Sequence, residues 1–463
     1  MSDLYTRFAS GVLFPLHEWA KGHRSVAVRR ALERTQWLPP HELGEYQRQR
    51  LAAFIRASYT RVPYVRRLFD THGLTPADVQ DVDGLRRLPL MDKAIIRANT
   101  DALKARDAQG LARFNTGGSS GEPLVFYIGK ERVSHDVAAK WRATRWWDVD
   151  IGDREIVVWG SPIELGAQDR VRMLRDGLLR SRLLPAFDLS AANLHRFIAE
   201  IRRFRPRMLF GYPSSLALMA AHAQAKGINL DDLGVRVAFV TSERLYDHQR
   251  DIITRVFGCP VANGYGGRDA GFIAHACPKG RLHITAEDLI VEILDRDGQP
   301  VTGGACGEIV ITHLATADFP FIRYRTGDVG ALDAEPCPCG RSLPVLARIE
   351  GRTTDFVVAA DGTVMHGLAL IYILRDLEGI DQFQILQESL ARTRVLVTTA
   401  TPLAPGVIAE ITTRFRQRLG ATVEISVEQV PVIPRAPSGK YRYVQSRVPL
   451  TPSGLGLPGI ESD

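Results

Sequence analysis

The residues best suited to chemistry begin with a glycine-rich stretch, Asn115 to Phe126, which reads NTGGSSGEPLVF. Glycine lets a backbone approach an anion closely, and the hydroxyl groups of Thr116, Ser119 and Ser120 add hydrogen-bond donors. A proline and an apolar run follow, which is typical of a phosphate-binding turn that enters a strand. An ordinary flexible turn has the same composition, so distant segments must supply the rest of a nucleotide site.

Two acidic turns could supply it. NGYGGRDAG could place the ring of Tyr265 against a nucleobase and the carboxylate of Asp269 on a magnesium ion that bridges phosphates. FIRYRTGDVG ends an apolar and aromatic strand, and Asp328 in it is suited to accept two hydrogen bonds from a ribose diol. A turn between strands is the plain alternative for both. Near the C-terminus Lys440 follows a flexible Pro-Ser-Gly, from which an ammonium could swing toward a negatively charged reacting centre; a surface lysine is its plain alternative.

Three cysteines and one histidine form a second candidate group: Cys277, His283, Cys337 and Cys339. They lie on two short turns, CPKGRLH and CPCG, and three thiolates with an imidazole make a closed tetrahedral set for structural zinc. Two interpretations remain open: the four residues bind zinc, or the cysteines are free, partly buried thiols. His275 could replace His283 as the fourth ligand. The other two cysteines, Cys259 and Cys306, are interpreted as isolated small hydrophobic residues.

The elements that must position these residues alternate between strand and helix after the glycine-rich stretch. Predicted strands are Glu155 to Trp159, Met208 to Gly211, Val235 to Thr241, Ile290 to Leu294 and Glu308 to His313. Predicted helices are Val133 to Trp147, Asn193 to Phe204, Ser214 to Lys226 and Asp247 to Phe257. This alternation favours an α/β architecture with largely parallel sheets.

The two ends of the chain have a different character. Residues 1–110 predict helices built on Leu, Ala and Arg. Beyond Gly351 the chain changes to short strands and two helical stretches, Gly367 to Leu377 and Pro405 to Leu419. The change predicts a domain boundary near residues 351–355.

Composition narrows the class of protein. The chain has 463 residues, 45% of them hydrophobic, and its net charge of +7 is spread along the sequence rather than clustered as nucleic-acid binding requires. No apolar run approaches the roughly 18 residues of a membrane span. Five cysteines, an odd number, argue against a secreted disulfide framework. We expect a cytoplasmic protein without an integral membrane segment, and contact of the apolar N-terminal SGVLFPLHEWA with a membrane surface stays open.

Several motifs together resemble one superfamily. TGGSSGEP, YGGRDAG, YRTGD, the pair Gly351-Arg352 and PSGK occur in the order seen in the adenylate-forming enzymes, the acyl-CoA synthetases and related ligases. The sequence looks most like the phenylacetate-CoA ligase family, especially its capsular polysaccharide biosynthesis branch. The branch resemblance rests on VPYVRRLF, GLTPADV, GYPSSL, CPKGRLHI and CPCGR, and the similarity extends from about residue 45 to residue 447.

The resemblance implies an α/β fold with a large N-terminal multi-sheet adenylation domain and a small mobile α+β C-terminal domain. Residues 1–110 would be the helical lead-in of the large domain, 111–351 its ATP- and acid-binding core, and 352–463 the lid. The residues that it implies around the ATP phosphates are Thr116, Gly118, Ser119, Ser120 and Gly121. Tyr265 would stack near adenine, Asp269 would bind magnesium, Asp328 would bind ribose and Arg352 would lie near the nucleotide. Lys440 would be catalytic, contacting the carboxylate and the α-phosphate.

The activity implied is ATP- and magnesium-dependent conversion of a carboxylic acid to an acyl-adenylate, followed by thioester formation with coenzyme A. The acid could be aromatic, and the protein a monomer or a homodimer. A role in polysaccharide or secondary metabolite biosynthesis rests on the branch alone. Three positions depart from the superfamily pattern. Glu122 replaces the usual Lys, Asp269 replaces the usual Glu, and Thr354 replaces the usual Asp or Lys. Because of these departures, two alternatives stay open. The enzyme could transfer the acyl group to an amine or hydroxyl acceptor, or the protein could be a nucleotide-binding homologue without catalytic activity.

Other nucleotide and hydrolase motifs fit less well. Gly117 to Gly121 matches G-x-S-x-G, but Pro123 and a strand-like run follow where a nucleophile elbow needs a helix. GYGGRDAG has Asp269 in place of the third glycine of a dinucleotide-binding turn, and no Gly-Lys-Ser or Gly-Lys-Thr ends the glycine-rich stretch.

Overall fold

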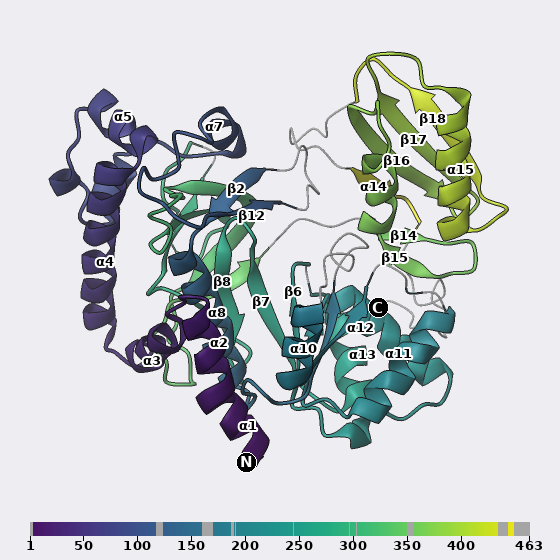
Figure 1. Cartoon of the computed structure of the whole chain (residues 1–463), viewed down its shortest axis with the longest axis horizontal. Helices are drawn as coiled ribbons and strands as arrows, with labels where there is room; N and C mark the ends of the chain where they lie inside the picture. The colour runs from purple at the N-terminus through teal and green to yellow at the C-terminus, as the bar shows by residue number, and fades with distance from the viewer. Residues whose placement is uncertain are drawn as a thin grey trace.

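The computed structural model describes most of the chain. The described residues are 3–116, 124–159, 170–186, 189, 191–243, 245–295, 297–301, 303–349, 356–433 and 443–448. Figure 1 shows a large N-terminal part, coloured purple to green, and a smaller yellow-green C-terminal part. The expected α/β fold with a large multi-sheet part and a smaller C-terminal part is confirmed.

Helices make up the beginning of the chain, as predicted. They are α1 (Leu4–Phe8), the π-helical turn η1 (Ala9–Leu13), α2 (Phe14–Ala20), α3 (Ser25–Thr35), α4 (Pro40–Arg61), α5 (Pro63–Thr71), the 3-10 turn η2 (Pro76–Asp78), α6 (Val82–Arg86) and α7 (Lys93–Ala98). Proline opens α4 and α5, where its missing N–H has no intrahelical partner to lose. Apolar residues of both helices, such as Phe54 and Phe69, are buried in one cluster. No helix among the described residues is long and apolar enough to cross a bilayer.

A two-stranded hairpin connects this region to the main sheet. Strand β1 (Ala112–Asn115) pairs antiparallel with β2 (Val125–Ile128), so the hairpin encloses the glycine-rich stretch. Helix α8 (Lys130–Arg145) follows directly and corresponds to the predicted helix from Val133 to Trp147.

An eleven-stranded sheet runs through the large part, in the order β10-β11-β12-β13-β9-β8-β7-β6-β5-β3-β4. The strands of its parallel half are β3 (Glu155–Trp159), β4 (Ser181–Pro185), β5 (Met208–Gly211), β6 (Val237–Thr241) and β7 (Val261–Gly267). The helices and turn that connect them are α10 (Arg170–Leu178), α11 (Ala191–Phe204), α12 (Pro213–Ala225), η3 (Asp231–Leu233) and α13 (Asp247–Phe257). All residues of β5 and β6 are buried, as expected for strands covered on both faces.

The other half of the sheet is antiparallel, so the expectation of largely parallel sheets is wrong for it. Its strands are β8 (Gly271–Ala276), β9 (Leu282–Ile284), β10 (Leu289–Leu294), β11 (Gly307–His313), β12 (Tyr324–Asp333) and β13 (Val345–Ile349). No helix connects consecutive strands of this half among the described residues, and the short turn from β8 to β9 can only reverse the chain into an antiparallel neighbour.

The C-terminal part has its own sheets and apolar core. A hairpin of β14 (Phe356–Val358) and β15 (Val364–His366) precedes α14 (Leu368–Arg375). A four-stranded sheet follows, in the order β18-β17-β16-β19, from β16 (Gln382–Ser389), β17 (Arg392–Thr398), β18 (Glu424–Gln429) and β19 (Val444–Ser446). Helix α15 (Pro405–Leu419) packs on it through Ile411 and Phe415, which are fully buried. The boundary predicted at residues 351–355 lies outside the described residues, and the division into domains stays a prediction.

Candidate functional site

The base of the glycine-rich stretch is closed by Thr116. Its N–H donates to the carbonyl of Leu124 over 3.0 Å, and its hydroxyl oxygen accepts from the N–H of Leu124 over 2.9 Å. The two bonds continue the β1–β2 ladder by one step, so the loop between them starts and ends at a fixed separation. Thr116 is partly exposed, and its hydroxyl proton remains available to a ligand.

Six of the predicted nucleotide and catalytic residues lie outside the described residues: Gly118, Ser119, Ser120, Gly121, Arg352 and Lys440. Their roles stay predictions. The described part of the site therefore consists of the hairpin base and the two acidic turns.

Tyr265 and Asp328 lie together in this site. The hydroxyl of Tyr265, on β7, donates to Oδ2 of Asp328, on β12, over 3.0 Å. The N–H of Asp328 in turn donates to Oγ1 of Thr326 over 3.1 Å, and Gly327 between them has φ of 77°. The structure thus brings together the residues predicted for adenine and for ribose.

Asp269 is held by a second tyrosine. The hydroxyl of Tyr324, at the start of β12, donates to Oδ2 of Asp269 over 2.6 Å. The other carboxylate oxygen accepts from the N–H of Ala270 over 3.1 Å. Strands β7 and β12 are separated in the sheet by β13, β9 and β8, so both tyrosine–aspartate contacts require the antiparallel half of the sheet to curl.

A buried arginine supports the turn that carries Asp269. Arg132 of α8 is 2% exposed, and its guanidinium donates to the carbonyl oxygens of Asp269 over 3.3 Å and Arg268 over 3.1 Å. Its Nε donates to Asp136 over 2.8 Å. Gly271 has φ of 84°, and a Cβ there would lie 3.1 Å from the Arg132 guanidinium and 2.8 Å from the ring of His313. Glycine is therefore required for the turn to pass over the arginine.

The carboxylate of Asp269 fits a magnesium ion in part. Magnesium prefers oxygen ligands and usually takes one or two carboxylates together with substrate phosphates. Each oxygen of Asp269 accepts one hydrogen bond within the protein, so lone pairs remain on both, and the side chain is partly exposed. The donor set is compatible with the predicted magnesium role.

The cysteine and histidine residues predicted for zinc form one cluster. The sulfur atoms of Cys277, Cys337 and Cys339 and a ring nitrogen of His283 all lie within 4.8 Å of one another. The Sγ atoms of Cys277 and Cys337 are 3.6 Å apart, and Nε2 of His283 is 3.2 Å from Sγ of Cys339. A tetrahedral zinc ion with ordinary bond lengths separates its ligand atoms by about 3.5 to 3.8 Å. The 3.6 Å separation matches that geometry and the 3.2 Å separation is slightly shorter, so the cluster is compatible with the metal.

The surroundings of the cluster favour zinc ligation further. The N–H at Nδ1 of His283 is 3.0 Å from the carbonyl oxygen of Leu343, which orients Nε2 toward the thiols as in many zinc sites. Burial lowers the pKa of His283 to about 4, so the imidazole is neutral and its lone pair is available. Burial also raises the pKa of the Cys337 thiol to about 12 without a metal. A zinc ion would supply the positive charge that a thiolate at this position needs.

The alternative zinc ligand, His275, does not join this cluster. Its ring is fully buried against Phe272, at a centroid distance of 5.4 Å, and near Phe239. The two cysteines interpreted as isolated also lie apart from the cluster, Cys259 buried and Cys306 exposed. Among the described residues the fourth candidate ligand is therefore His283 rather than His275.

Sequence reasoning missed Tyr324 and Arg132. The signal for Tyr324 was present, since strand periodicity places residues 324, 326 and 328 on one face and Asp328 had already been singled out. Arg132 left no comparable signal, because an arginine in the first turn of a polar helix is usually solvated.

Comparison with known proteins supports the resemblance. The family of the CapK C-terminal domain matches residues 357–447. Protein CapK of Staphylococcus aureus is 24% identical over 412 residues, which cover 88% of this chain and 90% of that protein. A phenylacetate-coenzyme A ligase of Thermus thermophilus is also 24% identical, over 440 residues that cover 88% of this chain and 97% of the ligase.

The fold has solved counterparts. A crystal structure of 2-hydroxyisobutyryl-CoA ligase in complex with 2-HIB-AMP and CoA superposes with a TM-score of 0.64 at 19% identity, over 90% of this chain and 92% of the ligase. The predicted resemblance is thus confirmed. The chain is a relative of Protein CapK and of the phenylacetate-coenzyme A ligases, and it has the fold of an adenylate-forming CoA ligase.

Proposed function

We propose that this protein activates a carboxylic acid with ATP and then transfers the acyl group to coenzyme A. In the first step a carboxylate oxygen attacks the α-phosphorus, and pyrophosphate leaves with its electron pair. In the second step the coenzyme A sulfur attacks the acyl carbonyl, loses its proton, and AMP leaves. The relatives named for phenylacetate-coenzyme A ligation support this pair of reactions.

One structural observation carries the proposal, namely that two tyrosine–aspartate pairs join β7 and the turn after it to β12 beside the glycine-rich hairpin. The ring of Phe126 on β2 packs edge-on against Phe321 at 5.8 Å, and Phe321 packs against Tyr324 at 5.1 Å. Tyr324 holds Asp269, and Tyr265 holds Asp328. Residues proposed for phosphate, magnesium and ribose thereby share one packed framework.

The chain's own residues would divide the work as follows. Asp328 would accept the ribose hydroxyls, and Tyr265 would pack against the adenine. Asp269 would ligate magnesium, whose charge offsets that of the phosphates. Lys440 would neutralise the charge that builds up between the carboxylate and the α-phosphate, an effect commonly worth about 100- to 1000-fold in rate. The small C-terminal part, which we expect to be a lid, would then move to admit coenzyme A.

An aromatic acid is the substrate class that we infer. Trp159 is the last residue of β3 and Tyr212 follows β5, so both lie at the carboxyl ends of adjacent parallel strands, where ligands of α/β sheets usually bind. Their rings stack at a centroid distance of 4.4 Å, and Phe210 lies 5.8 Å from Trp159. Trp159 is only partly buried, so a planar acid could contact its ring.

Carboxylate-dependent exchange of labelled pyrophosphate into ATP tests the first step. We expect exchange with an arylacetate or benzoate that falls at least about 100-fold in Lys440→Ala. Thioester formation is then measured with coenzyme A, an amine and a sugar hydroxyl as competing acceptors. Lys226→Ala, on the end of α12, is a matched lysine control and should leave exchange unchanged.

The outcomes separate the alternatives. Exchange without thioester would indicate transfer to an amine or hydroxyl acceptor, and no exchange across a wide panel of acids would indicate a nucleotide-binding homologue that lacks the chemistry. A place in capsule or other polysaccharide biosynthesis is supported only by the similarity to Protein CapK. Loss of capsule on deletion of the gene, restored by the wild-type chain but not by the Lys440→Ala chain, would support that role.

A further inference from the structure

The N-terminal helices carry an exposed apolar stripe that the candidate site does not use. Its members come from α1, η1 and α2: Leu4, Phe8, Val12, Leu16 and Trp19. Leu4 is 84% exposed and Trp19 is 78% exposed, values at which a large apolar side chain is almost fully in water. Their spacing of four, four, four and three residues places them along one side of a continuous helical segment.

The π-helical turn keeps this stripe straight. In an α-helix of about 3.6 residues per turn, residues four apart drift steadily around the axis. The turn from Ala9 to Leu13 is π-helical and holds more residues per turn, so it reverses part of the drift. Phe8, Val12 and Leu16 therefore share one face.

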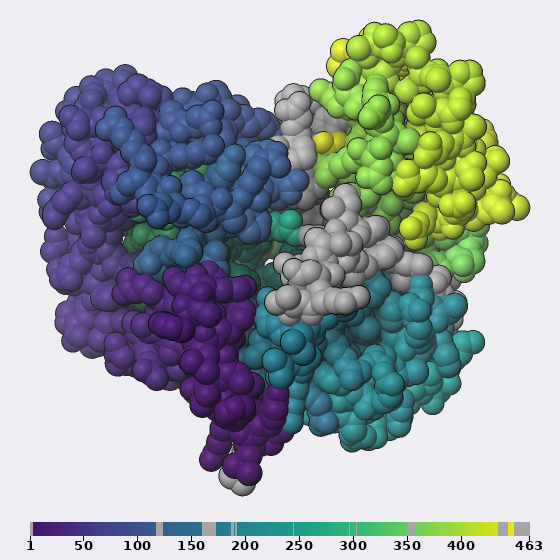
Figure 2. All heavy atoms as spheres, in the orientation of Figure 1, coloured from purple at the N-terminus to yellow at the C-terminus, as the bar shows by residue number. Residues whose placement is uncertain are grey.

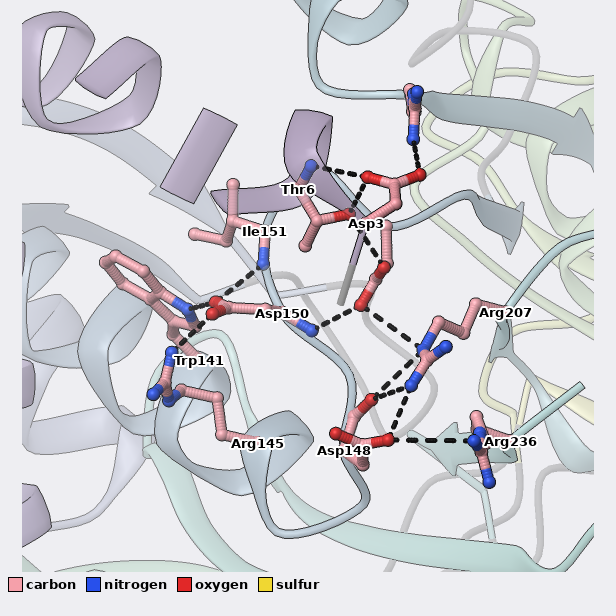
Figure 3. A network of polar contacts seen from close by, with 11 residues as sticks. Asp3, Thr6, Trp141, Arg145, Asp148, Asp150, Ile151, Arg207 and Arg236 are labelled. Carbon is pink, nitrogen blue, oxygen red and sulfur yellow. Dashed lines mark hydrogen bonds and ion pairs between the residues drawn. The ribbon is translucent and has the colours of Figure 1, made fainter. Parts of the chain in front are cut away.

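The opposite side of the same segment is fixed to the protein body. Oγ1 of Thr6 donates to Asp153 over 2.9 Å, and the ring of Phe14 packs edge-on against Trp141 at 5.1 Å. Ala9 is fully buried against Gly152, where a Cβ would lie only 2.4 Å from that of Ala9. Figure 3 shows Asp3 and Thr6 in the polar network that continues to Asp150 and Arg207. Because this side is held, the stripe is presented to solvent in a defined orientation, on the purple arm that projects from the molecule in Figure 2.

A second helix extends the apolar area. Helix α10 exposes Met173, Leu174 and Leu178. It lies beside α1, because the hydroxyl of Tyr5 donates to the carbonyl of Leu178 over 2.7 Å and the Arg180 guanidinium stacks 4.0 Å above the Tyr5 ring. The stripe and these three residues together are called the N-terminal apolar surface.

The charge around this surface is mostly basic, because its two acidic neighbours, Asp3 before α1 and Asp176 on α10, each form an ion pair with an arginine. From Leu4 through Arg24 the exposed charged side chains are Arg7, Lys21 and Arg24, all basic. The single acidic residue in that span, Glu18, is buried with its carboxylate 3.2 Å from His23. A second copy related by a two-fold axis would bring the same basic set against this surface, whereas an anionic lipid surface would neutralise it.

We propose that the N-terminal apolar surface docks this protein peripherally on bilayers that contain anionic lipid. The helical segment would lie in the plane of the membrane, with Leu4, Phe8, Leu16 and Trp19 at the boundary between headgroups and acyl chains. Arg7, Lys21 and Arg24 would contact the headgroup phosphates and carboxylates. Acid activation would then occur next to a lipid surface.

Co-sedimentation with vesicles of phosphatidylcholine, with or without phosphatidylserine, tests this proposal. The full-length wild-type chain should sediment with the vesicles that contain phosphatidylserine, and more weakly at high salt, because salt screens the basic residues. The double variant Leu16→Glu/Trp19→Glu should bind at least tenfold more weakly. Leu390→Glu/Val432→Glu replaces two exposed apolar residues of the C-terminal part and should bind like wild type.

The folding of the two double variants must be checked before their binding is compared. Equal circular dichroism spectra and melting temperatures for the two double variants show that both are folded. Absence of wild-type binding to phosphatidylserine vesicles, or binding that Leu16→Glu/Trp19→Glu leaves unchanged, overturns the proposal. A dimer in light scattering that this variant dissociates, with no vesicle binding, also overturns it and assigns the surface to a second copy.

Discussion

The hydroxyl of Tyr324 donates a 2.6 Å hydrogen bond to the carboxylate of Asp269, across strands that are not neighbours in the sheet. Asp269 stands where the motif resemblance predicts a glutamate, and an aspartate carboxylate is one methylene shorter. Tyr324 and the backbone contacts of Arg132 give that shorter side chain a fixed position. Fixed geometry is what a magnesium ligand requires.

Removing the Tyr324 hydroxyl should weaken magnesium use rather than abolish catalysis. In Tyr324→Phe we expect the magnesium concentration for half-maximal pyrophosphate exchange to rise about tenfold, which corresponds to a hydrogen bond to a charged group. The rate at saturating magnesium should stay close to that of wild type. Tyr59→Phe removes a long, exposed hydroxyl contact to Asp70 and serves as the control. An unchanged magnesium requirement in Tyr324→Phe would contradict the assignment of Asp269.

Asp328 should set the preference for ribose over deoxyribose. Wild-type protein should use 2′-deoxy-ATP or 3′-deoxy-ATP with a KM at least several-fold higher than that for ATP, because a partly buried acceptor then lacks its donor. Asp328→Ala should raise the KM for ATP and remove this discrimination. Asp333→Asn is the control, because Asp333 lies on the same strand but pairs with Arg281. This variant should still discriminate between ATP and the deoxy nucleotides. If Asp328→Ala still discriminates, another residue binds the sugar.

The cysteine and histidine cluster should hold structural zinc. Protein purified without added zinc should contain about one zinc per chain by elemental analysis, since the four ligands complete a closed tetrahedral site. Cys337→Ser should lose the metal and melt several degrees lower, because a structural metal stabilises only the folded state. Cys306→Ser, at an exposed cysteine, should change neither quantity. Well under one zinc per chain in the wild type would refute the zinc site.

The stability of the protein should fall in mildly alkaline solution because of His135. This side chain is buried, with Nδ1 2.6 Å from Asp288 and Nε2 3.2 Å from Glu131. Burial lowers its pKa, but the carboxylates outweigh that effect and raise the pKa of His135 to about 9, against an unfolded value of about 6.5. The stabilisation is complete below about pH 6.5 and is lost as the pH rises through about 9, at a cost of at most about 3 kcal/mol.

Melting temperatures measured between pH 6 and about pH 9.5 check this dependence. Wild type and His72→Gln, an exposed histidine control, should lose stability across the interval. His135→Gln should be less stable at pH 6 and should show a flatter profile. Parallel profiles for wild type and His135→Gln would mean that other groups cause the pH dependence.

Much of the local structure could be predicted from sequence patterns. The strands Glu155–Trp159 and Met208–Gly211 and the helices Asp247–Phe257 and Pro405–Leu419 have the predicted boundaries. In these segments the apolar periodicity is regular and a proline, glycine or polar turn marks at least one end. Predictions were less accurate at some element ends, as at α8, which begins three residues before the predicted Val133 in a first turn of polar residues.

What the sequence alone determined was therefore the set of chemical groups and their order along the chain: the glycine-rich stretch, the two aspartates, the lysine, and the cysteines with their histidine. Only the tertiary structure decided which of them meet. The pairing of Tyr265 with Asp328 and of Tyr324 with Asp269 depends on the curl of the antiparallel half of the sheet. Whether His283 or His275 joins the cysteine cluster depends on which residues the ends of β8, β9 and β13 bring together. Strand order and curvature arise from contacts between distant residues, which no local pattern encodes.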